Sequence, residues 1–191
     1  MDIKEKFLHD FPIYKGNKTD PYIILFDANI GYGKSTISRI IAKHDGSIIL
    51  NNDEVRRWLN DYHDRTGFLK ELQEYRLEQL LKHGNSCICD RNFNFCWKDL
   101  IDYFNNLGYK YYIIRLECSD DIIRKRLSKR EINIAGDNYS IATYEDYLKA
   151  KEKFPPVDDN LIDYVINTEG THEEAEKQII NFLEKFNLLE N

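Results

Sequence analysis

The sequence predicts an α/β protein in which helices cover both faces of a parallel β-sheet. Short apolar runs, typical of buried strands, alternate along the 191-residue chain with segments whose apolar residues recur at helical spacing. This alternation favours parallel strands, because each helix crosses over to the next strand. There is no internal repeat and no linker rich in Gly, Pro or Ser, so we expect residues 1–191 to form a single domain.

The expected strands are apolar runs that each end at a polar residue or a loop. They cover residues 22–27, 47–50, 86–90, 110–118 and 164–167. The expected helices cover residues 34–43, 68–83, 95–107, a segment that begins at Ser119, and about 172–187. Residues 1–20 are an N-terminal extension, expected to be a helix and a connector beside the first strand. Because ligands of such sheets bind beyond the carboxyl ends of the strands, we expect functional residues there.

Composition excludes several classes of protein. The formal net charge of −6 argues against a basic surface that coats nucleic acid, although it permits a local basic groove. No apolar run approaches about 18 residues, so we expect no membrane span. The first ten residues mix charges and lack a signal-like apolar stretch, which favours the cytoplasm. The four cysteines have no C-x-x-C spacing and are expected to be reduced thiols.

Residues 26–36, FDANIGYGKST, nearly match the phosphate-binding loop G-x-x-x-x-G-K-[ST]. A strand precedes the motif and a helix follows it, which is the context in which backbone N–H groups wrap phosphates. Gly31 and Gly33 supply a permissive backbone, while Lys34 would reach the terminal phosphates and the Ser35 hydroxyl would bind Mg²⁺. We therefore expect ATP or another nucleoside triphosphate, with Mg²⁺, to bind Asn29, Ile30, Gly31, Tyr32, Gly33, Lys34, Ser35 and Thr36.

Ala28 stands where the motif has its first glycine. A methyl group is the smallest departure from glycine and is tolerated where φ is negative, so we expect the loop to survive. Two alternatives are a glycine-rich turn without a ligand and a nucleotide binder without turnover.

Asp53 and Arg56 follow the second strand with Asp-x-x-Arg spacing, which lets both side chains face one site. The carboxylate could take the proton from an attacking hydroxyl while the guanidinium holds an anionic acceptor. The alternative is that Asp53 only caps a helix and Arg56 is solvated. The spacing alone favours the cap, but its position after a phosphate loop favours the catalytic interpretation.

Asp90 ends the apolar strand over 86–90, where a Walker B carboxylate would lie beside the water shell of Mg²⁺. The alternative is a turn residue before a helix. Arg91 and Asn92 are weaker candidates for contact with the acceptor.

Residues 124–130, RKRLSKR, contain Arg124, Arg126 and Arg130 and precede a polar, loop-like segment. Phosphoryl transfer spreads negative charge over the transferred group, and arginines from a lid can neutralise it while excluding water. We expect this lid over about 125–155. The alternative is a solvated helix end, where basic residues are also favoured.

These motifs, in this order, resemble those of P-loop kinases of the polynucleotide kinase and zeta-toxin type, over about residues 20–170. The nearest likeness is to the 5′-hydroxyl polynucleotide kinases of phage and bacterial RNA repair. The resemblance implies the three-layer, adenylate-kinase-like P-loop NTPase fold with a five-stranded parallel sheet and an arginine-bearing lid. The chain departs from the family at Ala28, at Ile30 where proline is usual, and at Tyr32 where a small residue is usual.

The resemblance also implies roles for individual residues in transfer of the ATP γ-phosphate to a hydroxyl. Its catalytic residues would be Asp53 as general base, Lys34 on ATP, and Arg130 on the transferring phosphate. Arg126 would lie near the adenine or its phosphates. The acceptor would be bound by Arg56, Asp90 and Asn92, and Mg²⁺ by Ser35 directly and Asp90 through water.

Three hypotheses for the acceptor stay open. The first is the 5′-OH end of RNA or DNA, onto whose bases nearby aromatic residues could stack: Trp58, Tyr62, Phe93, Phe95 and Trp97. The second is a metabolite, an antibiotic or a sugar nucleotide, and the third is no acceptor at all, in a nucleotide-binding switch. A nucleic-acid kinase needs a basic track, for which the candidates are Arg56, Arg57, Arg91 and Lys98. A metabolite kinase needs a closed, more neutral pocket.

Overall fold

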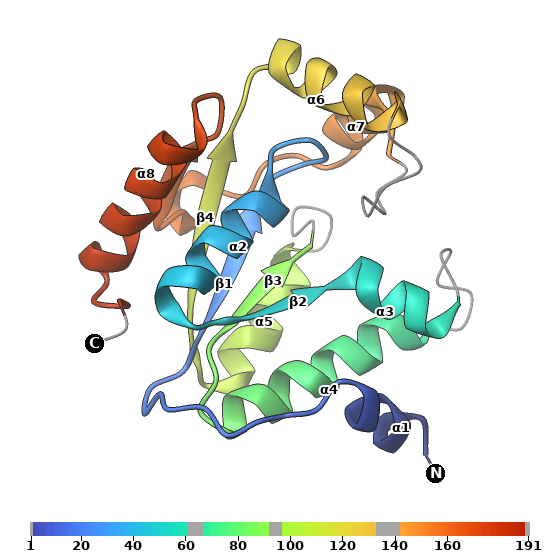
Figure 1. Ribbon diagram of the computed structural model, residues 1–191, viewed down its shortest axis with the longest axis vertical. Helices are drawn as coiled ribbons and strands as arrows, with labels where there is room; N and C mark the ends of the chain where they lie inside the picture. The colour runs from blue at the N-terminus through green and yellow to red at the C-terminus, as the bar shows by residue number, and fades with distance from the viewer. Residues whose placement is uncertain (1, 61–66, 92–96, 133–141, 190–191) are drawn as a thin grey trace.

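The computed structural model describes residues 2–60, 67–91, 97–132 and 142–189, and its centre is a five-stranded parallel sheet (Figure 1). The strand order is β2-β3-β1-β4-β5. The strands are β1 (Tyr22–Asp27), β2 (Ile48–Asn51), β3 (Cys87–Asp90), β4 (Lys110–Glu117) and β5 (Tyr164–Asn167). The expected α/β fold with a five-stranded parallel sheet is therefore confirmed.

Helices connect the strands as crossovers, and one further helix precedes the first strand and another follows the last. They are α1 (Ile3–Asp10), α2 (Lys34–Asp45), α3 (Asn52–Leu59), α4 (Phe68–Lys82), α5 (Trp97–Leu107), α6 (Asp120–Ile132), α7 (Tyr144–Lys153) and α8 (His172–Lys185), with a 3₁₀ turn at Asp159–Leu161. The sequence interpretation missed α7, although Thr143 and Asp146 form a capping box at its start. None of the helices in the described part of the chain is long and apolar enough to cross a membrane.

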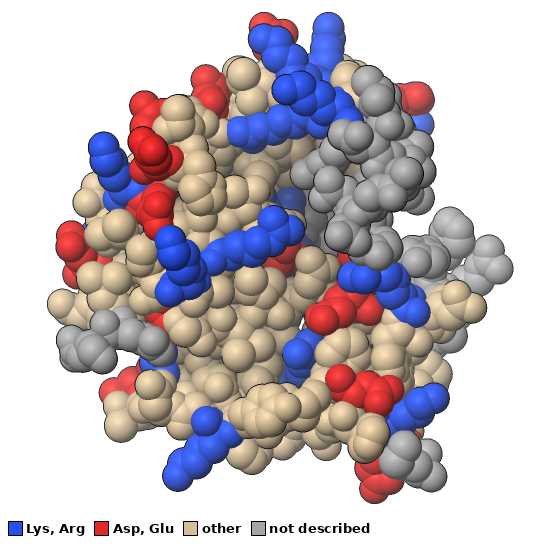
Figure 2. All heavy atoms as spheres, viewed as in Figure 1, with Lys and Arg blue, Asp and Glu red and all other residues tan. Residues whose placement is uncertain are grey.

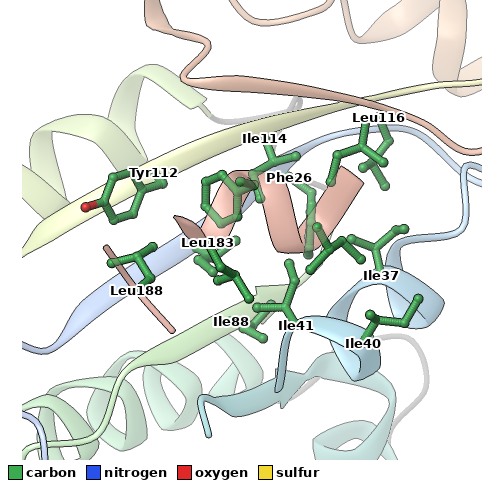
Figure 3. Close-up of a cluster of buried hydrophobic side chains, with 14 of the residues drawn as sticks. Phe26, Ile37, Ile40, Ile41, Ile88, Tyr112, Ile114, Leu116, Leu183 and Leu188 are labelled. Atoms are coloured by element: carbon green, nitrogen blue, oxygen red, sulfur yellow. The ribbon is translucent and has the colours of Figure 1, made fainter. Parts of the chain in front are cut away.

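Residues of β1 alternate between two cores, one on each face of the sheet. Ile24 and Phe26 pack with α2 and α8, as Figure 3 shows for Phe26 among Ile37, Ile41 and Leu183. The residues that alternate with them pack with α4 and α5 on the other face. All six residues of β1 are buried, which explains why this central strand is a continuous apolar run in the sequence.

The register brings polar strand ends together at the carboxyl edge of the sheet. Asn51 of β2 pairs with Asp90 of β3, and Asp27 of β1 pairs with Arg115 of β4. The expected second strand is shifted by one residue in the structure, so Asn51 is its last residue and not the first residue of a loop. Functional side chains can therefore meet at this edge.

The N-terminal helix α1 packs on α3 and α4, a position that the sequence did not indicate. Phe7 is buried among Val55, Leu69 and Leu72. The connector after α1 then bonds to the turn before β3, where Gly16 N donates to the His83 carbonyl at 2.8 Å.

Buried polar groups hold the start of β1 to the end of α2. The Asp45 carboxylate is fully buried and accepts hydrogen bonds from the Tyr22 hydroxyl at 2.7 Å, from Ser47 N at 2.9 Å and from the Ser47 hydroxyl at 2.6 Å. Burial raises the pKa of Tyr22, with a further contribution from the Asp45 charge, so its hydroxyl stays a donor.

Tyr22→Phe keeps the ring and removes one of these donors to Asp45. We expect it to lower the free energy of unfolding by about 1–2 kcal/mol, since a buried carboxylate loses a partner. Urea unfolding measures the change, with Tyr14→Phe as control, because the Tyr14 side chain is exposed. Equal stability of the two variants would show that the Tyr22 hydroxyl contributes nothing.

Candidate functional site

The loop between β1 and α2 needs glycine at two positions. Gly31 has φ +83° and Gly33 has φ +90°, both in the left-handed region. A Cβ on Gly31 would also lie 2.7 Å from Ile123 Cγ2 of α6, a side chain that is itself fully buried. The glycines thus let the loop turn back into α2 while α6 packs against it.

Ala28 does not break the loop. Among the described residues, only Asn60 and Asn187 combine a side chain with positive φ, so Ala28 has the negative φ that a methyl group tolerates. The side chain is buried in the core between the sheet and α2.

The Lys34 ammonium lies across the first residues of the loop. Lys34 Nζ donates to the Asn29 carbonyl at 2.7 Å and to the Ala28 carbonyl at 3.4 Å. The Asn29 side chain in turn accepts from Ile30 N at 2.8 Å. A positive charge at the start of α2, beside a loop of backbone N–H groups, is an arrangement that favours a bound phosphate.

Ser35 and Asp90 meet at the end of β3. The Ser35 hydroxyl lies close enough to the Asp90 carboxylate to oppose the rise of its pKa, and Asp90 is only 8% exposed. Burial raises the pKa of Asp90, the Ser35 hydroxyl and the charges of Lys34 and Arg39 oppose this rise, and the Asp53 charge adds to it.

Hydroxyl and carboxylate oxygens are the ligands that Mg²⁺ prefers, so Ser35 and Asp90 fit the ion predicted for them. The described ranges contain no group of three His, Cys, Asp or Glu side chains that could hold a metal.

Asn51 connects the Asp90 carboxylate to the backbone of Asp53. Its Nδ2 donates to Asp90 Oδ2 at 3.3 Å, and its Oδ1 accepts from Asp53 N at 2.7 Å. The buried Gln73 of α4 holds this turn, because its Nε2 donates to the Asn51 carbonyl at 2.9 Å and to Asn52 Oδ1 at 3.3 Å. The sequence interpretation missed both residues. The Asn-x-Asp spacing after a strand could have indicated Asn51 as a helix cap.

Asp53 and Arg56 form an ion pair within α3, with Arg56 Nη1 2.8 Å from Asp53 Oδ1. Their side chains are 39% and 32% exposed, so both can reach a ligand. The interpretation of Asp53 as a helix cap is wrong, because Asn51 caps α3. Arg56 Nε is buried and has no hydrogen-bond partner among the described residues. The expected contact of Arg56 with an acceptor stays a prediction.

Arg126 joins α6 to the phosphate loop. Its Nη1 donates to the Gly31 carbonyl and to Thr168 Oγ1, both at 3.2 Å, and its Nη2 donates to the Thr168 carbonyl. In the sequence interpretation this residue contacts the nucleotide. In the structure its guanidinium bonds to the loop itself and to the residue after β5. Arg124 lies instead over the Tyr144 ring, with its guanidinium carbon 4.7 Å from the ring centroid.

Two predicted site residues cannot be located. Asn92 lies outside the described residues, and so does the side chain of Arg130, whose backbone is in α6. Of the expected lid, the described parts are α6 and α7, which pack through Ile123, Leu127 and Tyr147. Of the aromatic candidates for base stacking, Tyr62, Phe93 and Phe95 also lie outside the described residues.

A pocket of about 310 Å³ opens beside the loop at the ends of β1 and β4. Its walls include Asn29, Tyr32, Glu117 and Phe154. The Tyr32 ring also contacts Tyr147 of α7, with ring centroids 6.3 Å apart. Tyr32, which stands where the family has a small residue, thus links the loop to α7, a helix within the expected lid.

A partly buried ion pair at the edge of this pocket was not predicted. Arg115 Nε lies 2.6 Å from Asp27 Oδ2, and the same guanidinium bonds to the Val157 carbonyl and to Asp159. It ties the strand that carries the phosphate loop to the segment after α7. Only the register of β1 against β4 could have indicated this pairing.

Gly31→Ala tests the close contact with α6. Both Gly31→Ala and Gly108→Ala impose a left-handed φ on alanine, but nothing lies within 4 Å of a Cβ at Gly108. We expect the free energy of unfolding to fall by about 1 kcal/mol for Gly108→Ala. For Gly31→Ala we expect a further loss of about 1–3 kcal/mol, because Ile123 is buried and cannot move aside. Thermal unfolding measures the loss of stability in both variants. Equal losses would contradict the close contact between residue 31 and Ile123.

Asn51→Asp tests the connection to Asp90. The new carboxylate can still accept from Asp53 N, but the donor to Asp90 is replaced by a negative charge. We therefore expect the pKa of Asp90 to rise further, because a nearby like charge disfavours ionisation. Titration by ¹³C NMR of the carboxyl groups measures it, with Asn51→Ser as the uncharged variant that keeps the cap. An unchanged pKa in Asn51→Asp would show that the two side chains do not interact.

Comparisons with known proteins agree with the observed fold. A family model described as an AAA domain, AAA_33, matches residues 29–156, which is more than half of the chain. No curated protein matches the chain. Similar solved structures include a fungal RNA kinase, with a TM-score of 0.58 and 17% identity over 88% of this chain and 88% of that chain.

Two further similar structures have titles that name small-molecule kinases. The APS kinase CysC of Mycobacterium tuberculosis, in complex with AMPPNP and APS, has a TM-score of 0.56 and 15% identity over 86% of this chain and 98% of that chain. The shikimate kinase of Acinetobacter baumannii, in complex with shikimate, has a TM-score of 0.58 and 14% identity over 90% of this chain and 97% of that chain. At these identities the likeness concerns the fold. With its loop, its sheet order and the family match, the chain belongs to the AAA domain family AAA_33 and has the α/β fold of the P-loop kinases.

Proposed function

We propose that the protein is an ATP-dependent kinase that transfers the γ-phosphate to a hydroxyl, and that the acceptor is the 5′-OH end of a nucleic acid. The observation that carries the proposal is the chain of contacts Ser35–Asp90–Asn51–Asp53. It runs from the phosphate loop to the backbone of Asp53, whose carboxylate on α3 is accessible. A protein that only binds nucleotide does not need that carboxylate.

Different residues in and around the loop would bind different parts of the nucleotide and its Mg²⁺. Backbone N–H groups of residues 29–36 would bind the phosphates, and Lys34 would neutralise their charge. Ser35 and Asp90 would hold Mg²⁺, which supplies further charge neutralisation at the phosphates when bound. Arg126 keeps the loop in position through the Gly31 carbonyl. Arg130 would bind the transferring phosphate.

Asp53 would accept the proton of the attacking hydroxyl and orient its oxygen toward the γ-phosphorus. In the structure Arg56 holds that carboxylate, and on substrate binding its guanidinium would bind an anionic group of the acceptor. The oxygen then bonds to phosphorus as the bond to the ADP oxygen breaks. Catalysis is mainly positioning and charge neutralisation.

Basic side chains near Asp53 support the nucleic-acid acceptor. Arg56 and Arg57 lie on the same helix as Asp53, and Arg91 follows Asp90 directly. This group of arginines is locally basic, although the formal net charge of the whole chain is −6. A phosphodiester backbone is a ligand that such a local group of arginines suits. A fungal RNA kinase shares the fold.

The pocket beside the loop favours a second candidate, a small-molecule kinase. Its volume of about 310 Å³ falls within the range of pockets that bind metabolites. Structures of kinases bound to APS and to shikimate share the fold. The acceptor in that case would be a sugar, a sugar nucleotide, an antibiotic or another hydroxyl metabolite.

Phosphate transfer from γ-labelled ATP tests the proposal. With Mg²⁺ and 5′-OH oligonucleotides in RNA and DNA forms, we expect the label on the 5′ end. We expect Asp53→Asn to lower kcat by about 10²- to 10⁴-fold, because the general base is lost. Asp102→Asn, a change on the exposed side of α5, serves as the matched control.

Undiminished labelling by Asp53→Asn would overturn the role of Asp53. Label on a metabolite, with none on either oligonucleotide, would favour the second candidate. ATP binding without transfer to any acceptor would favour a nucleotide-binding switch.

A further inference from the structure

The N-terminal helix α1 has no part in the proposed reaction, but it lies against α3, the helix that carries Asp53. Figure 1 shows α1, α3 and the start of α4 together at one side of the molecule. They meet in a hydrophobic cluster apart from the two cores of the sheet, in which the fully buried Phe7 packs with Val55, Leu69 and Leu72. Val55 is the buried residue of α3. Beyond its first turn, α3 is therefore held by α1 and α4.

The side of α3 that packs on α1 is opposite to the side that carries the site residues. At 3.6 residues per turn, Val55 and Trp58 point about 140–160° away from Asp53 around the helix axis, whereas Arg56 is only about 60° from it. In the view of Figure 1, Figure 2 shows basic and acidic atoms next to one another over α3, which fits a charged outer side. Contacts with α1 therefore act on Asp53 through the body of the helix.

Trp58 joins α3 to α1 by packing and by a hydrogen bond. Its ring lies edge-on to the Phe7 ring, with centroids 5.2 Å apart, and its centroid is 6.3 Å from that of the Phe11 ring. Its Nε1 donates to Asp10 Oδ2 at 2.7 Å, and this bond, together with one from His9, lowers the pKa of Asp10. In the sequence Trp58 was a candidate for base stacking, whereas in the structure its ring packs against α1.

A largely buried charge connects all three helices. The Arg76 side chain of α4 is 11% exposed, and its guanidinium carbon lies 4.8 Å from the centroid of the ring of Phe11, the residue directly after α1. Its Nη1 is 3.6 Å from Oε2 of Glu54, the neighbour of Asp53 on α3. A charge this buried is costly without partners, so the Phe11 ring and Glu54 stabilise it together. Displacement of α1 would therefore also weaken the contact of α3 with α4.

We propose that α1 is a brace that positions α3, so that Asp53 and Arg56 meet the acceptor hydroxyl at the phosphate loop. The brace consists of Ile3–Asp10 and acts through the contacts of Phe7 and Asp10 with α3. This inference rests on the proposed function, because it takes Asp53 as the base. It makes Phe7, Asp10 and Trp58 positioning residues of the reaction.

Nucleotide binding should not depend on the brace, because other elements hold the phosphate loop. Arg126 of α6 bonds to the Gly31 carbonyl and to Thr168, and Arg115 bonds to Asp27 at the end of β1. We therefore expect damage to the brace to slow phosphate transfer and to leave the affinity for nucleotide unchanged. A helix that only stabilises the fold would instead lower the free energy of unfolding and leave the kinetics of the folded protein unchanged.

Phe7→Ala tests the brace, with Phe104→Ala as the matched control. Both remove a fully buried phenylalanine ring, but Phe104 lies on α5 and packs in a core of the sheet. For Phe7→Ala we expect kcat with a 5′-OH oligonucleotide to fall about 10- to 100-fold, because a misplacement of about 1 Å can cost about 10²-fold. Calorimetry should show an unchanged Kd for AMPPNP. Phe104→Ala should keep kcat, when both variants are assayed at a temperature at which circular dichroism shows them folded.

Two milder variants test the brace even where Phe7→Ala fails to fold. Trp58→Phe keeps an aromatic ring and removes the donor of the bond to Asp10, and Asp10→Ala removes its acceptor. We expect each to lower kcat about 2- to 5-fold, as for the loss of one hydrogen bond. The double variant should lower kcat no further, because both changes remove the same bond. Hydrogen exchange of the α3 amides should be faster in each variant, with the α2 amides unchanged.

The outcomes separate the brace from the proposed function. A lower kcat with unchanged affinity for AMPPNP, in the α1 and Trp58 variants and not in Phe104→Ala, supports the brace. Unchanged kcat in folded variants whose α3 amides exchange faster overturns it and leaves the kinase assignment intact, because α1 then stabilises α3 without positioning Asp53. A loss of AMPPNP affinity that accompanies the loss of kcat overturns it too. A wild-type protein that does not label the oligonucleotide overturns the proposed function and the brace together.

Discussion

The parallel register of β2 against β3 is the constraint on which the site depends. It sets Asn51 beside Asp90, and the two hydrogen bonds of the Asn51 side chain then fix Asp53 relative to Asp90. A slip of one residue would turn each of these side chains to the other face of the sheet. Side chains of β2 and β3 pack in the cores on both faces, which opposes such a slip, so the cores that stabilise the fold also hold Asn51 beside Asp90.

Two arginines hold the phosphate loop from outside. Arg126 connects the Gly31 carbonyl to Thr168, and Arg115 connects Asp27, at the end of β1, to the segment after α7. Both contacts join the loop to the elements around the expected lid. A change in the position of α6 or α7 would therefore be transmitted to the loop through charged hydrogen bonds, which are stronger than neutral ones.

The charges close to Asp53 and Asp90 affect the site more than the net charge of the chain does. The chain is acidic overall, yet Lys34 and Arg39 of α2 act on the Asp90 carboxyl, and Arg56 and Arg57 of α3 bond to Asp53. Burial alone would keep Asp90 protonated to a higher pH than an exposed carboxyl, and the Ser35 hydroxyl and the charges of Lys34 and Arg39 oppose that effect. The same charges that favour the ionised carboxylate suit a polyanionic acceptor.

The sequence by itself determined the strands, most of the helices and the phosphate loop. These features depend on local properties: apolar runs, helical spacing, and a contiguous Gly-Lys-Ser segment between a strand and a helix. It also indicated Asp53, Arg56 and Asp90, because they follow strand ends. Only the tertiary structure decided that Asn51 caps α3 and contacts Asp90, that Arg126 bonds to the loop, and that Arg39 acts on the site. Those contacts join residues from different elements, and strand register and helix packing set their distances, which no local pattern encodes.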